Sequence, residues 1–361
     1  MQYRRVCLEA LGYTLPDEVV TSAELEQRLE PAYHRLRLPE GRLELMSGIR
    51  ERRFFPPGTL PSSVSLASAE KALQASGIDR QCIGALVHGS VCRDHLEPAT
   101  ACAVHHGLQL PEECLVYDVS NACLGMLTGL VQVANMIELG QIRAGLVVGT
   151  ECGRQLVENT VRRLNEDHSL SRQDVKLLVA SLTIGSGSVA LVVCDEDLTT
   201  TNNHLTTATA LAHTDHHQLC RSEGLDEFMH TDSEQLMNEG VATGAETFSR
   251  FLTETGWQRD EIDKTACHQV GVAHRKLMFE AFGLDPRIDF PTLSRLGNTG
   301  AAALPLTLAL ALEAKHIVPD DRVALLGIGS GINCQMIAVH WQRTRVLGIN
   351  ERFKELPMSF A

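Results

Sequence analysis

The stretch Asp118-Val-Ser-Asn-Ala-Cys123-Leu-Gly125 decides how this chain folds, because a strand pattern changes into a helical pattern within it. The preceding run, Leu115-Val-Tyr-Asp-Val119, has the β-rich apolar composition of a buried strand. Residues 122–139 have the composition of an apolar helix, which Gly140 closes. A strand that leads directly into a helix is typical of layered α/β proteins. Cys123 therefore falls at a predicted strand-to-helix turn.

The position of Cys123 has a chemical consequence. Free backbone N–H groups and the positive end of the helix dipole favour a thiolate over a thiol at a helix start. We therefore predict that Cys123 is a nucleophile. The alternative is a structural role, because cysteine is among the residues most often buried in apolar helices. The chain has ten other cysteines, and none is placed in this way so clearly.

Outward from this turn, β-rich apolar runs alternate with helical ones almost throughout the chain. This alternation predicts an α/β fold with buried sheets. The predicted strands include residues 84–88, 115–119, 144–149 and 189–194, and a predicted helix covers residues 63–75.

The sequence also contains a short internal repeat. Ile184-Gly-Ser-Gly-Ser188 and Ile328-Gly-Ser-Gly-Ile332 each precede a predicted strand, and Asn121 and Asn298 each open a helix upstream. The separations are 63 and 30 residues, and the excess roughly matches a charged insert at about 153–176. We predict two similar halves, residues 1–195 and 196–361, with a tail at about 342–361.

Composition limits the classes of function. The formal net charge of −13 argues against a nucleic-acid partner, because binding phosphates requires a basic surface. Eleven cysteines without a CxxC pair fit a reducing compartment, and neither a signal segment nor an apolar run long enough to span a membrane is visible. We expect a soluble, cytoplasmic protein. Arg50, Arg52 and Arg53 either form a local basic patch for a phosphate-bearing substrate or belong to a solvated charged turn.

Two further residues have the placement of functional groups. His268 ends the short run Thr265-Ala-Cys-His268-Gln269 immediately before a predicted helix, so its side chain is placed to project into a crevice. The alternatives for it are capping and a satisfied core position. Asn298 stands at a helix start, where it is either a cap or an amide donor beside His268. No metal site is predicted, since His216-His217 has no third ligand.

The turn Gly327-Ile-Gly-Ser330-Gly331 contributes a backbone rather than a side chain. Its glycines allow the main chain to approach a ligand closely, and it lacks the length and lysine of a P-loop. The backbone N–H groups of Cys123 and Ser330 are thus candidates for an oxyanion hole. The alternative is an ordinary turn.

Together these motifs resemble the thiolase-fold condensing enzymes, close to β-ketoacyl-acyl-carrier-protein synthase III. The resemblance rests on Asn-Ala-Cys123-Leu-Gly, His268-Gln-Val, Gly-Asn298-Thr-Gly-Ala-Ala and Gly-Ile-Gly-Ser-Gly, in that order, and spans roughly residues 1–341. It implies a five-layered αβαβα fold of two similar halves, usually an obligate homodimer. It also implies that Cys123 carries an acyl thioester while His268 and Asn298 serve condensation.

One departure refines the resemblance. Synthase III typically has Gln-Ala-Asn after its histidine, whereas this chain has Gln269-Val270-Gly271. That departure and the segment 91–100 look more like the OleA-type thiolases, which join two fatty acyl-CoA molecules head to head without decarboxylation. Their motif has a glutamate 26 residues before the cysteine, and Glu97 stands there. In that family the glutamate reaches the site of the partner subunit.

A carboxylate base has a clear purpose in such a reaction. A malonyl donor forms its carbanion by losing CO₂, whereas a plain acyl thioester must lose an α-proton to a base. Burying Glu97 in an apolar acyl tunnel would raise its pKa and make it a better base. The alternative for Glu97 is a solvated acid at a helix start, with Pro98 at the first helical position.

The leading hypothesis is an acyltransferase that condenses two acyl-CoA thioesters to a β-keto acid and needs no cofactor. Four alternatives stay open: a decarboxylating synthase III that uses malonyl-acyl-carrier protein in fatty acid or polyketide initiation, 3-hydroxy-3-methylglutaryl-CoA synthase chemistry, a non-catalytic thiolase-fold subunit, and acyl-carrier protein instead of coenzyme A as donor. The length of the acyl chain cannot be derived from motif spacing.

Overall fold

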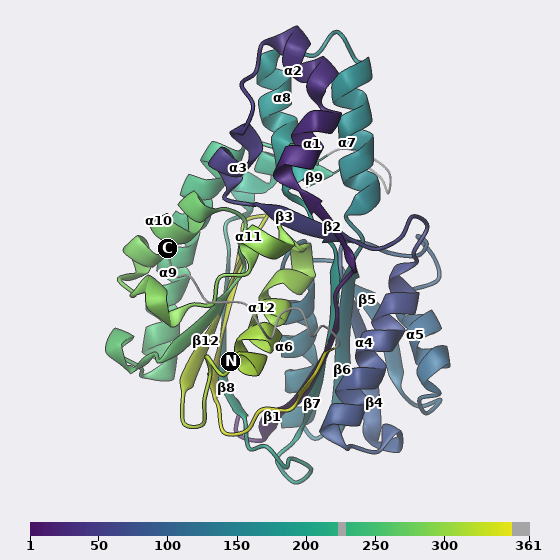
Figure 1. Ribbon diagram of the computed structural model, residues 1–361. Helices are drawn as coiled ribbons and strands as arrows, with labels where there is room; N and C mark the ends of the chain where they lie inside the picture. Colours follow the sequence, from purple (N-terminus) through teal and green to yellow (C-terminus); the bar gives the residue numbers. More distant parts are fainter. Residues whose placement is uncertain (223–228, 349–361) are drawn as a thin grey trace.

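The protein is a five-layered αβαβα assembly in which helices cover and separate two half-sheets (Figure 1). The computed structural model describes residues 1–222 and 229–348. The main sheet follows one hydrogen-bonded path, β11-β12-β13-β8-β1-β7-β6-β4-β5, with β14 beside β1. β1 and β8 share the single residue pair Cys7 and His204. The path is therefore two half-sheets that meet at a narrow seam.

The first half-sheet comes from the N-terminal part of the chain. Its strands are β1 (Val6–Thr14), β4 (Ile83–Gly89), β5 (Leu115–Val119), β6 (Ala144–Glu151) and β7 (Gly187–Asp195), with β14 (Val346–Leu347) added at β1. The second half-sheet comprises β8 (His204–Ala212), β11 (Lys264–Cys267), β12 (Arg322–Gly329) and β13 (Asn333–His340).

The two half-sheets repeat the same strand directions. β4 lies parallel to β6, which pairs antiparallel with β7, and β7 pairs antiparallel with β1. In the second half β11, β12, β13 and β8 follow the same sequence of directions. The place of β5 is taken there by Asp289, which forms a parallel bridge with Thr265. This repetition of strand directions corresponds to the short internal repeat in the sequence.

Helices form the other three layers. α6 (Gly125–Glu138) and α12 (Ala303–Glu313) lie between the half-sheets, and α12 is buried from Ala303 to Leu312. The outer layers are α4 (Pro61–Ser76) and α5 (Thr100–Leu108) on one side and α9 (Ser233–Thr255) and α10 (Val272–Phe282) on the other. The short α11 (Leu293–Leu296) leads toward α12.

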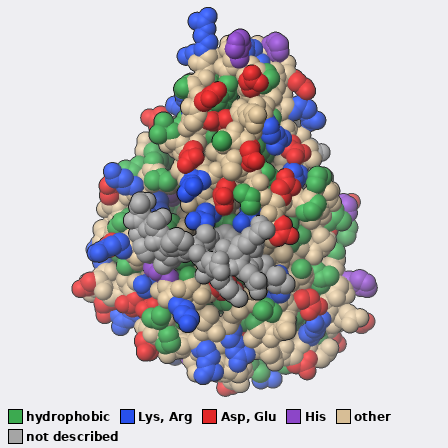
Figure 2. All heavy atoms as spheres, in the orientation of Figure 1, with side chains coloured by type: hydrophobic (Ala, Val, Ile, Leu, Met, Phe, Trp, Pro, Cys, Tyr) green, Lys and Arg blue, Asp and Glu red, His purple; other side chains and the backbone are tan. Residues whose placement is uncertain are grey.

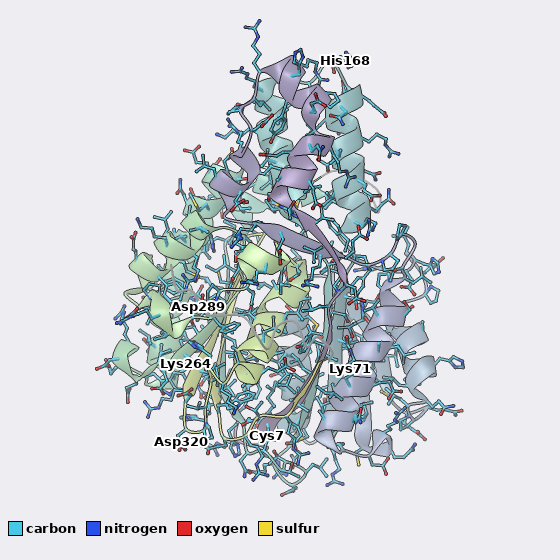
Figure 3. All side chains as sticks on the ribbon, viewed as in Figure 1. Cys7, Lys71, His168, Lys264, Asp289 and Asp320 are labelled. Carbon is cyan, nitrogen blue, oxygen red and sulfur yellow. The ribbon has the colours of Figure 1, made fainter. Side chains whose placement is uncertain are left out.

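A helical cap stands at one end of the layers. It contains α1 (Ser22–Arg28), α2 (Glu30–Leu36), α3 (Arg42–Ser47), α7 (Arg154–Glu166) and α8 (Arg172–Leu178). Thr21 and Ser171 begin α1 and α8 with capping boxes, which satisfy free backbone N–H groups at both helix starts. In Figure 3, His168 marks the tip of this cap and Cys7 lies at the opposite end of the molecule.

Two small ribbons join the cap to the layers. One pairs β2 (Glu18–Thr21) with β3 (Glu51–Phe54), and the other pairs β9 (Cys220–Ser222) with β10 (Met229–Thr231). The helices α7 and α8 occupy the charged insert expected at about 153–176. On the face that Figure 2 shows, acidic and basic side chains are interspersed.

The strand and helix predictions are confirmed within a few residues. The four predicted strands are β4, β5, β6 and β7, and the helix predicted at 63–75 is α4. The division into halves at 195 and 196 stays a prediction. In the tail predicted at 342–361, residues 342–348 include β14, and residues 349–361 lie outside the described part. In the described ranges, no helix is both long and apolar enough to cross a membrane.

Candidate active site

Cys123 lies on a tight turn between β5 and α6. The Leu124 N–H donates to the Asn121 carbonyl at 2.8 Å, and Ala122 has a φ of 44°, a left-handed value that is uncommon for a residue with a side chain. The helix begins at Gly125, three residues later than predicted. Cys123 therefore precedes the first helical turn instead of lying inside it.

Gly125 allows this turn to approach the first half-sheet. A β-carbon at Gly125 would lie 3.0 Å from the carbonyl carbon of Gly89, and one at Gly89 would lie 2.5 Å from the Gly125 oxygen. Contacts this short leave no room for a side chain at either position, so the helix start packs backbone against backbone on the end of β4.

The glycine-rich end of β12 packs directly on the nucleophile turn. A β-carbon added at Gly329 would lie 3.6 Å from the Cys123 Cβ and 3.1 Å from Leu124 Cγ. The Asn333 side-chain amide donates to Asn121 Oδ1 at 2.9 Å, which joins the β12–β13 turn to the residue that starts the Cys123 turn. Ser330 follows Gly329, so the turn predicted to supply its backbone N–H lies beside Cys123.

His268 reaches the site from the end of β11. Its backbone N–H donates to the Leu326 carbonyl of β12 at 3.2 Å, three residues before Gly329. Its side chain is 3% exposed, and both ring nitrogens are buried without a hydrogen-bond partner in the described structure. Burial, and next the neighbouring His274, lower the pKa of His268 to about 3. The imidazole is therefore neutral at physiological pH.

Asn298 is held by its backbone and by one side-chain bond. Its N–H donates to the Thr183 carbonyl and its own carbonyl accepts from Gly185, both at 2.9 Å. The Gly300 N–H donates to Asn298 Oδ1 at 3.0 Å. This bond fixes the side-chain orientation and leaves the Nδ2 group to donate. The residue is buried, and it opens the turn that leads into α12.

Gln269 connects the His268 segment to the Asn298 segment. It is 3% exposed, and its Oε1 accepts the backbone N–H groups of Thr292 and Leu293 at 2.9 and 3.0 Å. Its Nε2 donates to the Phe290 carbonyl at 2.8 Å. Both the oxygen and the nitrogen of this side-chain amide thus bind the segment that leads to Asn298. The sequence motif contained Gln269 but gave it no role.

The electrostatics correct the expectation of a thiolate. Burial, followed by Cys220 and Glu151, raises the pKa of Cys123 to about 12. A hydrogen bond from the backbone N–H of Cys123 lowers this pKa, but the loss of water around the sulfur outweighs it. Cys123 and His268 therefore form a neutral thiol and a neutral imidazole in the unliganded protein.

Glu97 is not brought to Cys123 within one chain. It lies on the exposed loop between β4 and α5, and α5 begins at Thr100 with Ala99 as its cap, so Pro98 is not a first helical residue. No hydrogen bond or ion pair of Glu97 is present among the described residues. The burial of Glu97 in an apolar acyl tunnel, which the resemblance places in the partner subunit, stays a prediction.

The arginine cluster does not form a surface patch. Arg52 is 1% exposed and donates to Ser22 Oγ and to the Leu182 carbonyl at 3.1 and 3.2 Å. Burial lowers the pKa of Arg52 to about 10. Arg53 is also buried and donates to the Pro16 carbonyl. Only Arg50 is exposed, because β3 turns its neighbours into the protein, and the predicted phosphate-binding patch is therefore wrong.

Sequence reasoning missed Glu151, a buried carboxylate beside the site. It ends β6, is 4% exposed, and contributes to the raised pKa of the Cys123 thiol. A signal was present, since a charged residue stands two positions after the apolar run 144–149, at the carboxyl end of a buried strand. Ligand sites of α/β proteins form at such strand ends.

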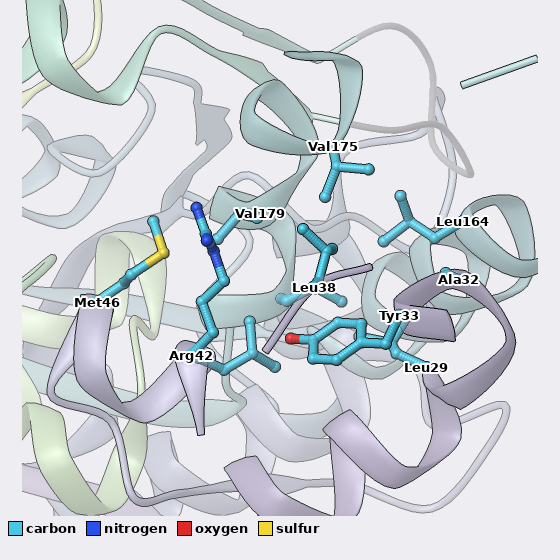
Figure 4. Close-up of a pocket in the computed structure, with 11 residues that line it drawn as sticks. Leu29, Ala32, Tyr33, Leu38, Arg42, Met46, Leu164, Val175 and Val179 are labelled. Carbon is cyan, nitrogen blue, oxygen red and sulfur yellow. The ribbon is translucent and has the colours of Figure 1, made fainter. Parts of the chain in front are cut away.

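A separate apolar cavity of about 20 Å³ lies inside the cap (Figure 4). Side chains of α2 and α3 face those of α7 and α8 across it, among them Tyr33, Arg42 and Leu164. Neither Cys123 nor His268 lines it. This volume accommodates about one water molecule and no acyl chain.

The comparisons with known proteins agree with this geometry. Residues 60–155 match the thiolase N-terminal domain, and residues 252–341 match the C-terminal domain of 3-oxoacyl-[acyl-carrier-protein] synthase III. The acyl-CoA:acyl-CoA alkyltransferase of Shewanella oneidensis is 42% identical over 94% of this chain and all of its own length. The enzyme of that name from Xanthomonas campestris is 33% identical over 94% of this chain and all of its own.

Solved structures give the same result. A crystal structure of Xanthomonas campestris OleA superposes with a TM-score of 0.91 at 33% identity, covering 94% of this chain and 98% of that one. Another, with bound lauric acid and lauroyl-CoA, has a TM-score of 0.90. Fold and site thus define a thiolase-fold acyltransferase. Within that class, the chain belongs to the OleA family of acyl-CoA:acyl-CoA alkyltransferases.

Proposed function

We propose that the protein joins two fatty acyl-CoA thioesters by non-decarboxylative Claisen condensation and releases a β-keto acid. The observation that carries the proposal is the packing of the Cys123 turn against the glycine-rich end of β12, with the uncharged His268 tied to the same strand. Relatives at 42% and 33% identity are named acyl-CoA:acyl-CoA alkyltransferases. Coenzyme A thioesters are the substrates, and no further cofactor takes part.

Acylation comes first. The Cys123 sulfur attacks the thioester carbonyl of the first acyl-CoA, and its proton passes to the neutral His268 and then to the departing coenzyme A sulfur. A neutral imidazole is required for this transfer, and the lowered pKa of His268 provides it. The backbone N–H groups of Cys123 and Ser330 stabilise the oxyanion.

Condensation follows on the acylated enzyme. Glu97 removes an α-proton from the second acyl-CoA, while His268 and the Asn298 amide donate hydrogen bonds to the enolate oxygen. The α-carbon attacks the acyl carbonyl, a carbon–carbon bond forms and the bond to the Cys123 sulfur breaks. The departing sulfur takes up one proton, which balances the proton that Glu97 removed, so that the Cys123 thiol and the Glu97 carboxylate are both restored. Water then cleaves the remaining thioester and releases the β-keto acid and coenzyme A.

The base acts in a homodimer, with Glu97 of each chain entering the site of its partner. The exposed apolar surface around the Glu97 loop supports this arrangement. Leu96 and Val91 on the loop are 81% and 49% exposed. Exposed apolar side chains close together in the chain mark interaction surfaces. The eleven free cysteines support a reducing, cytoplasmic location.

The test is incubation of the purified protein with myristoyl-CoA and no malonyl donor. Release of coenzyme A together with a β-keto acid, followed by mass spectrometry, is expected. Glu97→Gln should abolish the β-keto acid while Cys123 still gains an acyl group. Glu112→Gln, which changes an exposed acid after α5, is the control and should behave as wild type.

Two outcomes would overturn the proposal. In the first, neither coenzyme A nor β-keto acid is released from acyl-CoA alone. In the second, Glu97→Gln leaves turnover with malonyl-acyl-carrier protein intact and wild type requires that donor, which would identify a decarboxylating synthase III.

A further inference from the structure

Glu151 is a buried carboxylate without a cationic partner. It is 4% exposed at the end of β6, and none of the ion pairs in the described structure involves it. Burial raises the pKa of Glu151. The hydrogen bonds that its carboxylate accepts from backbone N–H groups lower this pKa and offset only part of the effect of burial. Burying a charge is costly unless other groups bind it, so the position of this side chain requires a physical explanation.

The explanation lies in the segments that Glu151 holds. Its Oε1 accepts the N–H of Val91 at 3.0 Å, and its Oε2 accepts the N–H of Cys92 at 3.2 Å. Both residues open the loop that carries Glu97. Oε1 also accepts the N–H of Ala301 at 3.1 Å, in the turn that follows Asn298. Hydrogen bonds to a charged acceptor are about twice as strong as neutral ones.

The contact with the Asn298 turn is also steric. A β-carbon at Gly300 would lie 3.0 Å from both Cδ and Oε1 of Glu151, and the φ of Gly300 is 54°. The N–H of the same glycine orients the Asn298 amide. The carboxylate therefore packs against the residue that sets the direction of Asn298 Nδ2.

We propose that Glu151 is a positioning residue that couples the two active sites of the dimer. This inference rests on the proposed function, in which Glu97 acts in the partner subunit. One carboxylate holds the Asn298 turn of its own site and the loop that delivers Glu97 to the other site. A displacement of either segment is therefore transmitted to the other by the Glu151 side chain, and so affects both active sites.

Glutamine cannot replace the carboxylate. Its amide offers one acceptor oxygen. With that oxygen in the place of Oε1, the bonds to Val91 and Ala301 are kept but the NH₂ group faces the Cys92 N–H donor. In the reverse orientation the bonds to Val91 and Ala301 are both lost, so either orientation disturbs the loop that carries Glu97. Glu151→Gln should therefore slow condensation by about tenfold or more, while Cys123 acylation stays within about twofold. This split separates positioning from a general loss of folded protein, which would lower both steps together.

Mixed dimers test the coupling itself. One chain carries Cys123→Ala and the other is intact, with different affinity tags, so that only one site turns over. Glu151→Gln in the intact chain then changes the Asn298 turn of the working site. Glu151→Gln in the Cys123→Ala chain changes only the loop that brings Glu97 to it. Myristoyl-CoA is the substrate, and we expect each placement to lower β-keto acid formation without lowering acylation.

The controls distinguish the possible failures. Glu97→Gln in the Cys123→Ala chain should abolish condensation. If it does not, the dimer arrangement of the proposed function is wrong. If it does, and Glu151→Gln in the same chain has no effect, the coupling is wrong. Glu9→Gln is the matched control, because Glu9 is buried and accepts backbone N–H groups of Thr200 and Thr201, between β7 and β8.

A second variant keeps the test decisive if Glu151→Gln does not fold. Glu151→Asp retains the charge but is one methylene shorter, so it cannot reach both segments at once. It should show the same split between acylation and condensation. Equal losses in both steps with Glu151→Asp would overturn the positioning role.

Discussion

The starts of α6 and α12 occupy equivalent places in the two half-sheets but have different chemistry. Gly329, at the end of β12, packs against Cys123 in the turn just before α6. Glu151, at the end of β6, binds Ala301 in the turn just before α12. Each half-sheet thus supplies a strand end that supports the helix start of the other half. Where glycine ends the strand, backbone N–H groups can approach a reacting atom, and where glutamate ends it, the neighbouring turn is anchored.

The connections that follow β12 and β6 account for the different roles of these two strand ends. Three residues, 330–332, join β12 to β13, which keeps the backbone close to Cys123. Between β6 and β7 the chain instead forms α7 and α8 of the cap. One half therefore contributes a tight turn beside Cys123, and the other contributes helices of the cap.

The largest expected effect is that substitutions at the two helix starts impair different steps of the reaction. Cys123→Ala should remove the acyl adduct completely, because no other group replaces the sulfur. Asn298→Ala should keep the adduct and lower β-keto acid formation by about 10²-fold, because one donor to the enolate is lost. Intact-protein mass spectrometry measures the adduct. Loss of the adduct in Asn298→Ala would show that the amide serves acylation instead.

A smaller effect is expected from adding a methyl group at Gly329. Its β-carbon would lie 3.1 Å from Leu124 Cγ and 3.6 Å from the Cys123 Cβ, which displaces the oxyanion turn. Gly329→Ala should slow acylation by roughly 10- to 100-fold in stopped-flow coenzyme A release. Gly240→Ala in α9 is the control, since its nearest contact is 3.4 Å, to Ile328. Unchanged acylation in Gly329→Ala would place the oxyanion hole elsewhere.

The smallest effect concerns stability and pH. The pKa of His268 is about 3 in the folded protein and about 6.5 when unfolded, so below pH 6.5 only the unfolded chain binds this proton. Stability is therefore lost as pH falls from 6.5 toward 3, by about 1.4 kcal/mol per pH unit for this group. In urea unfolding between pH 7 and 5, His268→Gln should show a shallower slope than wild type.

The control for this measurement is His168→Gln, because His168 is exposed at the tip of the cap. It should leave the slope unchanged. His88 and His274, whose pKa values burial lowers to about 4, add to the wild-type slope and remain in both variants. An equal slope in wild type and His268→Gln would contradict a neutral, buried His268.

The sequence predicted the fold and the placement of Cys123, His268 and Asn298 at strand ends and helix starts, because local apolar patterns and glycines determine these positions. Interactions between distant segments were not predictable in this way. The burial of Arg52 depends on contacts with Leu182, and the neutral state of Cys123 depends on the surfaces packed around it. Glu151 binds residues 60 and 150 positions away, and no motif spacing contains that information.

The backbone N–H groups around Glu151 have a consequence for the effect of ionic strength. Salt screens exposed ion pairs such as Arg5 with Asp197, but it weakens contacts buried away from solvent much less. Because Glu151 is held by amides instead of a cation, no mobile ion competes for its place. The alignment of the Glu97 and Asn298 segments should therefore persist in concentrated salt, and any sensitivity of turnover to salt would report on capture of the charged coenzyme A.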